Sequence, residues 1–221
     1  MDGSTGFSGE NCMAPSLAAI VLAGGKSSRM GQDKALLSWR GMPLLRRTCE
    51  VALQCSSPVY VVTSRVPEYR PIVPESVQLI PEDETAFQGP LVGFAQGLHQ
   101  IQVSPIQPDW VLLLACDLPF LQVPLLQRWI AQLDQVKSPI ALLPRSDKGW
   151  EPLCGFYQGK CYNHLTDSIA RGTRSFQTWL SQETVQEIVF HPNPDIAAQE
   201  KQMLFNCNTP ADLLQVPIMP E

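Results

Sequence analysis

The chain alternates short, continuous apolar runs with longer segments in which apolar residues recur every three or four positions. The runs are the length of strands and show no polar alternation, which is typical of strands buried on both faces of a sheet. We expect such strands at Leu17–Ala23, Val59–Val62, Val77–Ile80, Trp110–Ala115 and Ile140–Leu143.

Three helices are predicted between these strands, each opening at a proline. Pro43 begins a helix that runs to about Leu53, and Pro90 and Pro124 begin two others, because proline at the first helical position loses no hydrogen bond. The apolar residues after Pro90 and Pro124 fall on one face of each helix. Alternating strands and helices predict an α/β domain with a doubly wound, mostly parallel sheet and right-handed crossovers.

The carboxyl-terminal third is less regular. The expected elements are a strand at 152–157, helices at 162–170 and 175–181, and a strand at 185–190. Prolines beyond residue 190 predict irregular wrapping of the chain and no second domain. We therefore expect one domain over residues 17–215, between a flexible N-terminal tail at 1–16 and a C-terminal tail at 216–221.

The composition excludes several classes of protein. The 221 residues carry a formal net charge of −5, which offers no basic excess for nonspecific nucleic-acid binding. No apolar run approaches the length of a membrane span, and the polar N-terminal residues are unlike a secretory signal. The seven cysteines have no metal-binding spacing, which is typical of reduced thiols. We expect a cytoplasmic protein without nucleic-acid or membrane partners, for which Met13 is an alternative start.

The strongest chemical signal is the segment IVLAGGKSSRMGQDK at residues 20–34. Gly24 and Gly25 let the chain turn sharply after the first strand, and the amides beyond the turn point outward at the strand's carboxyl end. Arg29 and Lys34 add two cations to this turn. Amides beside Arg and Lys suit a polyphosphate, although the segment matches neither GxGxxG nor GxxxxGK[ST].

Asp117 is the second signal, because it directly follows the apolar run 110–116 and precedes the strand-breaking Pro119. A carboxylate at the carboxyl end of a central strand can hold Mg²⁺ and bridge it to phosphate. The alternative is that Asp117 caps the helix near Pro124, but it lies too far upstream for that role. We expect Asp117 to be a metal ligand.

Two polar clusters have two interpretations each. Asp83, at the end of another apolar run, suits a nucleotide or metal contact, but residues 82–84 equally suit a solvated acidic turn. Asn206 and Asn208 lie two apart on an extended stretch, where they can hydrogen-bond a ligand. They also suit an Asx turn before a helix at Pro210.

A further pair of cations, Arg171 and Arg174, lies in a predicted turn. This turn could meet an anionic second substrate, with a solvated loop as the alternative. No nucleophile with a neighbouring base is readable, since the sequence has neither GxSxG nor a recognisable Cys–His pair. We therefore expect no covalent intermediate.

The motifs LAGGKSSRMGQDK, IPEDETAFQGPLVG, LACDLPFL, EPLCGFY and FNCNTPADL occur in the order and at roughly the spacing of one family. From about residue 20 to residue 214 the chain resembles the molybdenum cofactor guanylyltransferases, within the wider NTP-transferase superfamily. LAGG in place of LAAG, together with NCNTP, is more similar to the guanylyl branch than to the cytidylyl branch. The resemblance implies a Rossmann-like fold with a mixed sheet, of the nucleotide-diphospho-sugar transferase type.

The resemblance also implies a reaction. The terminal phosphate of molybdenum-bearing molybdopterin attacks the α-phosphorus of GTP with Mg²⁺ as cofactor, and pyrophosphate leaves. The implied residues are Leu22, Ala23, Gly24, Lys34, Asp83 and Asp117 for the nucleotide, with Asp117 also the Mg²⁺ ligand, and Asn206 and Asn208 for the molybdopterin side. We expect Arg29, Lys34 and Asp117 to act in catalysis at the phosphates. A phosphate oxyanion needs no general base, and Mg²⁺, loop amides and cations stabilise the developing charge.

Other functions stay open at this point. One is a cytidylyltransferase acting on molybdopterin or on a sugar or alditol phosphate, and another is a nucleotide-binding interaction module without catalysis. Gln32 stands where many family members have glycine, and Thr63–Ser64 stands where asparagine is common, so no nucleotide contact is carried over to 63–64. Beyond GTP and molybdopterin, the implied partners are molybdopterin-insertion proteins or recipient molybdoenzymes.

Overall fold

The computed structural model describes residues 15–24, 33–82, 89–105, 107–136, 138–207, 209 and 211–212. Three predicted site residues, Arg29, Asp83 and Asn208, lie outside the described residues. So do Gly25, the C-terminal tail and all but the last two residues of the N-terminal tail.

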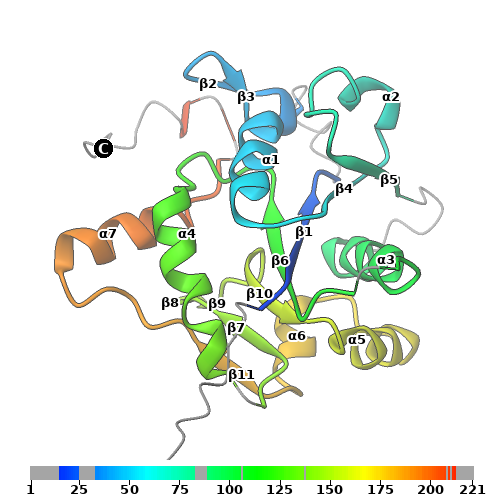
Figure 1. Ribbon diagram of the computed structural model, residues 1–221, viewed down its shortest axis with the longest axis vertical. Helices are drawn as coiled ribbons and strands as arrows, with labels where there is room; N and C mark the ends of the chain where they lie inside the picture. The colour runs from blue at the N-terminus through cyan, green and yellow to red at the C-terminus, as the bar shows by residue number, and fades with distance from the viewer. Residues whose placement is uncertain are drawn as a thin grey trace, which may run out of the picture.

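A seven-stranded sheet with the order β11-β7-β10-β6-β1-β4-β5 forms the centre of the molecule (Figure 1). Its strands are β1 (Leu17–Leu22), β4 (Val59–Thr63), β5 (Gln78–Pro81), β6 (Trp110–Ala115), β7 (Ala141–Leu143), β10 (Cys154–Gln158) and β11 (Val185–Glu187). β10 runs antiparallel to both of its neighbours, and every other pairing in this sheet is parallel. The prediction of a mostly parallel, mixed sheet is confirmed.

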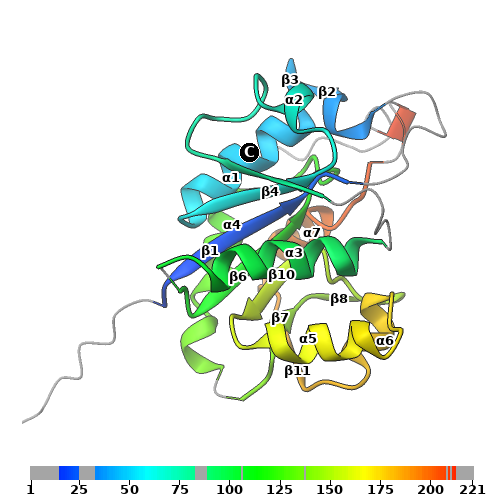
Figure 2. The ribbon, with the colours of Figure 1, turned by 90° about the vertical axis from the view of Figure 1, so that its right-hand side faces the viewer.

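Helices cover both faces of the sheet (Figures 1 and 2). They are α1 (Leu44–Cys55), α2 (Val66–Tyr69), α3 (Pro90–Gln102), α4 (Val123–Ile130), α5 (Cys161–Ala170), α6 (Phe176–Leu180) and α7 (Pro194–Gln202). Two 3-10 turns, η2 (Lys34–Leu36) and η4 (Leu133–Gln135), and two small ladders complete the described elements. The ladders pair β2 (Ser38–Trp39) with β3 (Met42–Pro43) and β8 (Arg145–Ser146) with β9 (Gly149–Trp150). Among these helices, none has the length and apolarity needed to cross a membrane.

The alternation of side chains along β1 explains the two layers, because successive residues of a strand point to opposite faces. Ala19 and Val21 join the core beneath α1 and α4, whereas Ala18, Ile20 and Leu22 join the core beneath α3, α5 and α6. A strand buried on both faces must be apolar throughout, as the sequence of β1 is.

Helix α3 lies very close to β1, and a glycine permits this approach. A Cβ built on Gly97 would lie 2.8 Å from Cδ1 and 2.9 Å from Cγ2 of Ile20. Real Cβ atoms do not approach other atoms so closely. A side chain at residue 97 would therefore force the Ile20 side chain or the helix to shift.

Several predicted elements differ from the structure at their ends or in their burial. The helix predicted to open at Pro124 begins one residue earlier, at Val123, and the strands predicted at 152–157 and 185–190 are Cys154–Gln158 and Val185–Glu187. β5 is the edge strand and is only partly buried, so the expectation of burial on both faces was wrong for Val77–Ile80. Pro43 is the N-cap of α1 and belongs to β3, one residue before the helix that it was expected to open. Pro90 is the first residue of α3, as predicted.

The prediction of irregular wrapping beyond residue 190 was wrong, because this segment contains α7. The Asn193 side chain caps the helix by accepting a hydrogen bond from Asp195 N at 2.8 Å, and Pro194 occupies the first helical position. Glu200, fully buried, accepts hydrogen bonds from Arg128 Nε at 2.9 Å and Trp129 Nε1 at 2.8 Å. These bonds attach α7 to α4.

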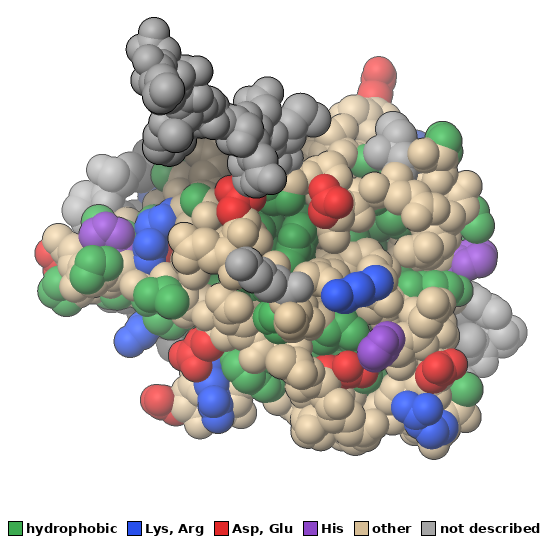
Figure 3. Space-filling model, turned by 60° about the horizontal axis from the view of Figure 1, so that its bottom comes forward, with side chains coloured by type: hydrophobic (Ala, Val, Ile, Leu, Met, Phe, Trp, Pro, Cys, Tyr) green, Lys and Arg blue, Asp and Glu red, His purple; other side chains and the backbone are tan. Residues whose placement is uncertain are grey.

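The order of the strands predicts a crevice at the carboxyl ends of the central strands. From β1 the chain continues to β4 and β5 on one side, and then crosses to β6 on the other side of β1. Open α/β sheets bind ligands at the carboxyl ends of the strands where the order reverses in this way. On the face shown in Figure 3, acidic and basic side chains are interspersed, as the modest net charge of −5 leads one to expect.

Candidate active site

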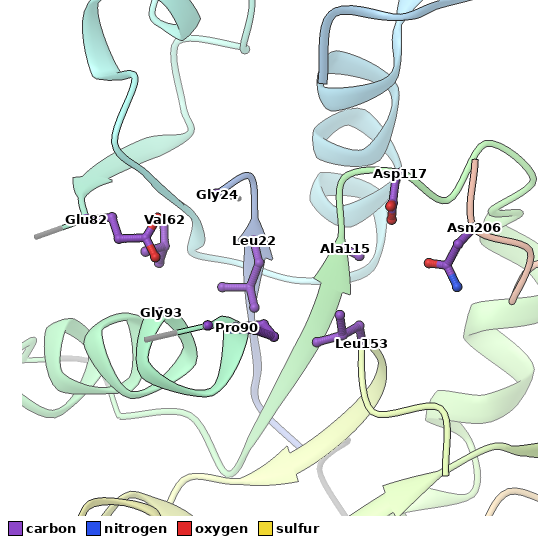
Figure 4. A pocket seen from close by; sticks show the side chains of 11 residues that line it. Leu22, Gly24, Val62, Glu82, Pro90, Gly93, Ala115, Asp117, Leu153 and Asn206 are labelled. Carbon is purple, nitrogen blue, oxygen red and sulfur yellow. The ribbon is translucent and has the colours of Figure 1, made fainter. Parts of the chain in front are cut away.

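A pocket of about 240 Å³ opens at the carboxyl ends of β1 and β6 (Figure 4). It is lined by Leu22, Gly24, Val62, Glu82, Gly89, Pro90, Gly93, Ala115, Asp117, Leu153 and Asn206. Figure 4 shows Glu82 at one side of this space and Asp117 and Asn206 at the other. The pocket therefore has two ends with different chemistry.

At the first end, the Glu82 carboxylate faces two glycines. A Cβ on Gly24 would overlap Oε2 of Glu82, and a Cβ on Gly93 would lie 3.5 Å from Oε1. The Glu82 backbone is held by the bond from its N–H to Thr63 O, at 2.8 Å. At this end the two glycines let the Glu82 carboxylate lie close to the main chain.

Oε2 of Glu82 is buried and has no hydrogen-bond partner within the described part of the chain. Burial raises the pKa of this carboxyl group above its usual range, because removal from water disfavours the charged form. Buried polar atoms are nearly always hydrogen-bonded, so an orphaned carboxylate oxygen in a pocket marks a place for a donor supplied by a ligand.

At the second end, Asp117 follows β6 and pairs with Lys34, whose Nζ lies 3.6 Å from Oδ2. The two side chains keep 18% and 26% of their exposure, so solvent and a ligand can reach the pair. Burial raises the pKa of Asp117, and the positive charge of Lys34 partly opposes this shift. α4 is preceded by Gln122 as its N-cap, so Asp117 does not cap that helix.

The chain near Asn206 is tied to the same loop. Cys207 N donates a hydrogen bond to Asp117 O at 2.8 Å, which fixes this C-terminal segment beside the end of β6. Asn206 is exposed and lines the pocket on the side of Asp117 (Figure 4). Its Nδ2 donates to Leu204 O in a long bond of 3.4 Å. The sequence motif is thus brought to the predicted site.

The LAG segment divides between the pocket and the core. Leu22 and Gly24 line the pocket, but Ala23 does not. Ala23 N donates to Val62 O at 3.0 Å, and the methyl group packs in the core beneath α1. The local structure therefore offers a ligand the Leu22 side chain and, packed against Gly24, the carboxylate of Glu82.

Sequence reasoning missed Glu82, which it treated as part of a possible solvated turn. The residue that faces the pocket is set by where β5 ends, and β4 and β5 pair as far as Thr63 and Pro81. No local signal separates Glu82 from the two acidic residues that follow it. Val62 and Leu153 were missed as pocket residues because they are contributed by neighbouring elements.

Two other groups take no part in this pocket. Arg174 donates to the carbonyl oxygens of Ile169 and Thr173, both at 2.8 Å, and thereby closes the end of α5. The six described cysteines are free thiols, and burial raises the pKa of Cys49 and of Cys154 to about 12. These thiols stay protonated at neutral pH, which makes them poor nucleophiles.

A metal ion at this site would need a bound phosphate compound to complete its coordination, because the described part of the protein supplies few ligand atoms. Across the described ranges, no three His, Cys, Asp or Glu side chains gather into a metal-binding group. Asp117 does offer one hard carboxylate oxygen at the rim of the pocket. A single carboxylate fits Mg²⁺, which keeps several waters and takes its remaining ligands from phosphates.

Comparison with known proteins assigns the chain to a family. Residues 19–187 match the model of the MobA-like NTP transferase domain. The chain belongs to this family. A probable molybdenum cofactor guanylyltransferase of Trichormus variabilis is 52% identical over 198 residues, which cover 89% of this chain and 88% of that relative. The molybdenum cofactor guanylyltransferase of Pseudomonas entomophila is 30% identical over 90% of this chain and 97% of its own.

Solved structures show the same MobA-like fold. The molybdopterin-guanine dinucleotide biosynthesis protein A of Archaeoglobus fulgidus has a TM-score of 0.65 at 23% identity, covering 90% of this chain and 95% of its own. The 4-diphosphocytidyl-2C-methyl-D-erythritol synthase of Anaerococcus prevotii has a TM-score of 0.63 at 13% identity, covering 91% and 94%. The predicted family and fold are confirmed, and the protein is a nucleotidyltransferase.

Proposed function

We propose that this nucleotidyltransferase transfers GMP from GTP to molybdenum-bearing molybdopterin with Mg²⁺ as cofactor, and releases pyrophosphate. The names of the relatives support the acceptor and the base, and the two ends of the pocket support the division of labour. The unsatisfied carboxylate of Glu82 is the observation that carries the choice of GTP.

Guanine is the nucleobase that best satisfies this carboxylate. Its N1–H and its 2-amino group point the same way, so one carboxylate can accept from both. Cytosine presents one amino donor beside the lone pair of N3, which a carboxylate repels. A site built to pair with a donor rejects ligands that lack it, because its own polar group is then left buried and unpaired. Glu82 therefore favours GTP over CTP.

At the other end, Lys34 and Asp117 suit the phosphates. The Lys34 ammonium would stabilise charge on the phosphate oxygens and on the departing pyrophosphate, where electrostatic stabilisation has its largest effect. Asp117 would hold Mg²⁺ and orient Lys34. The ion would supply further neutralisation of the triphosphate. Arg29, Asp83 and Asn208 keep their predicted roles in this proposal.

The acceptor needs no activation by the protein. A phosphate monoester is largely ionised at neutral pH, since its second pKa is about 6. Its oxygen can attack the α-phosphorus directly, which agrees with the protonated state of the described thiols. Asn206 lies on the side of Asp117 and would contact the molybdopterin. The free thiols also support a reducing compartment such as the cytoplasm.

The test is a panel of nucleotides with purified molybdopterin under anaerobic conditions. Pyrophosphate release and dinucleotide formation are measured with GTP, ITP, CTP and ATP, with and without Mg²⁺. We expect GTP to give the highest kcat/KM and ITP, which lacks the 2-amino group, to lose roughly tenfold or more. A preference for CTP would overturn the choice of base, and turnover without a divalent cation would overturn the role of Mg²⁺.

A further inference from the structure

The residue before Lys34 is held by a second group of side chains that lies outside the pocket. Asp33 caps the η2 turn, which starts at Lys34, by accepting a hydrogen bond from Ala35 N to its Oδ1 at 3.1 Å. Its other oxygen, Oδ2, accepts from Arg65 NH1 and from the Tyr69 hydroxyl, each at 2.8 Å. Both carboxylate oxygens are therefore occupied.

We propose that Arg65 and Tyr69 are positioning residues for Lys34 and act on it through Asp33. This inference rests on the proposed function, since it concerns the lysine assigned to the phosphates. A carboxylate held by three donors has one orientation, and it is bonded to the turn that carries Lys34. Fixing the backbone at residue 34 sets the point and direction from which the flexible lysine side chain leaves the turn, and the pairing with Asp117 then holds its ammonium at the pocket.

Two of the three side chains in the cluster are largely buried, whereas that of Arg65 keeps 40% of its exposure. The Asp33 side chain keeps 10% of its exposure and Tyr69 keeps 2%. Burial and the neighbouring Asp33 raise the pKa of Tyr69, so the phenol remains a proton donor. A buried carboxylate that loses a charged or hydroxyl donor is left poorly compensated, and the turn must shift to bring water to it.

The same cluster is bonded to the base end of the pocket through Thr63. The fully buried Thr63 accepts from Arg65 N with its hydroxyl at 3.0 Å and from Glu82 N with its carbonyl at 2.8 Å. One residue at the end of β4 thus holds both the base-facing Glu82 and the group that orients Lys34. The two ends of the site share this frame.

A double-mutant cycle separates positioning from a purely structural role. Tyr69→Phe should lower kcat with GTP by roughly tenfold and raise the KM for GTP by a smaller factor, about threefold, because misplacing Lys34 affects the transition state more than the bound substrate. In the Lys34→Ala background, Tyr69→Phe should have no further effect. Equal losses in both backgrounds would overturn the proposal.

Arg65 gives an independent check. Arg65→Met should lower kcat as Tyr69→Phe does, and Arg65→Lys, which keeps a donor for Asp33, should recover part of the loss. Tyr162→Phe is the matched control, because its hydroxyl bonds the His99 ring at 3.1 Å where α3 meets α5. This control should leave kcat unchanged. No recovery with lysine, or an equal loss in the control, would contradict the positioning role.

A double-mutant cycle measured by ligand binding tests the proposal without requiring turnover. Wild type, Tyr69→Phe, Lys34→Ala and the double variant are titrated with the α,β-methylene analogue of GTP and Mg²⁺ by calorimetry, with thermal unfolding measured in parallel. Coupling between Tyr69 and Lys34 in the dissociation constant supports the proposal, and strict additivity in variants that remain folded overturns it. If wild-type protein binds the analogue but transfers no GMP to molybdopterin, the proposed function fails while this cycle still reports on the cluster.

Discussion

Glu82 and Asp117 are two carboxylates that face one pocket from opposite sides, and burial raises the pKa of both. They differ in their partners. Asp117 has the Lys34 ammonium at 3.6 Å, whereas a buried oxygen of Glu82 has no partner within the described residues. Asp117 suits a cation and its partner Lys34 suits phosphates, whereas the unpaired Glu82 carboxylate suits neutral hydrogen-bond donors.

This difference suggests how one pocket can separate two tasks. An ion pair that stays partly exposed can exchange its partner for a metal ion without a large desolvation cost. A lone buried carboxylate is stabilised most by a ligand that brings N–H groups to it, because without a ligand its buried oxygen has no hydrogen bond. Chemistry and base selection can therefore be altered separately, and the following predictions use that separation.

The largest effect is expected for Asp117→Asn. The amide keeps the size of the side chain but removes the charge that would hold Mg²⁺, so kcat should fall by about a thousandfold or more. The KM for GTP should change much less. Steady-state kinetics at several Mg²⁺ concentrations measure both, with Asp134→Asn in the exposed η4 turn as the control. A loss of less than tenfold would argue against the role of Asp117.

Glu82→Gln should give the next largest effect, and in a different parameter. The amide nitrogen opposes one of the donors of guanine, so kcat/KM for GTP should fall by about a hundredfold while kcat at saturation falls much less. The advantage of GTP over ITP should shrink at the same time. If kcat alone fell and the order of nucleotides were unchanged, Glu82 would belong to the chemical end of the pocket.

The pH dependence of activity should sharpen the comparison further. In the proposed function Asp117 must be ionised to hold Mg²⁺, so protonation at low pH should produce an acid limb, shifted upward because burial raises the pKa of this group. Lys34 lowers that pKa, so Lys34→Gln should move the limb to higher pH. A kcat/KM profile over the acid range, which reports the groups of the free enzyme, tests this shift. A limb that stays in place or moves down would contradict the pairing.

The smallest effect is on folding. The raised pKa of Glu82 means that its charged form is less favourable in the folded protein than in the unfolded chain. Glu82→Gln should therefore stabilise the empty protein slightly, by at most about 1 kcal/mol at neutral pH after solvent screening. The gain should vanish as the pH falls through the raised pKa, where Glu82 is already neutral. Urea unfolding at two pH values measures this, and destabilisation at neutral pH would show that Glu82 has a partner.

The sequence predicts those parts of the molecule whose signals are local. β1 and β6 are uniformly apolar and are followed by glycine or aspartate, so their burial and the place of Asp117 could be predicted. α7 was missed because Pro192 and Pro194 suggested irregular chain, although Asn193 before Pro194 is a helix-start signal.

The role of Glu82 could not be predicted for a different reason. Its orientation depends on how far β5 pairs with β4 and on two glycines, Gly24 just after β1 and Gly93 in α3, that leave room for its carboxylate. Such contacts join segments that are far apart in the chain, and no spacing along the sequence encodes them. The pairing of Lys34 with Asp117 is equally non-local, although both residues were predicted for the site.

The close contact between Gly97 and Ile20 has a consequence for substrate choice. Gly97 lies one turn along α3 from Gly93, and Ile20 lies two residues before Leu22, so the contact lies behind the pocket wall. The contact therefore sets the spacing between α3 and β1, and with it the width of the pocket between Gly93 and Leu22. A methyl group added at residue 97 would widen this space from behind. If the pocket holds the base as proposed, its selectivity can change through packing residues that do not contact the nucleotide.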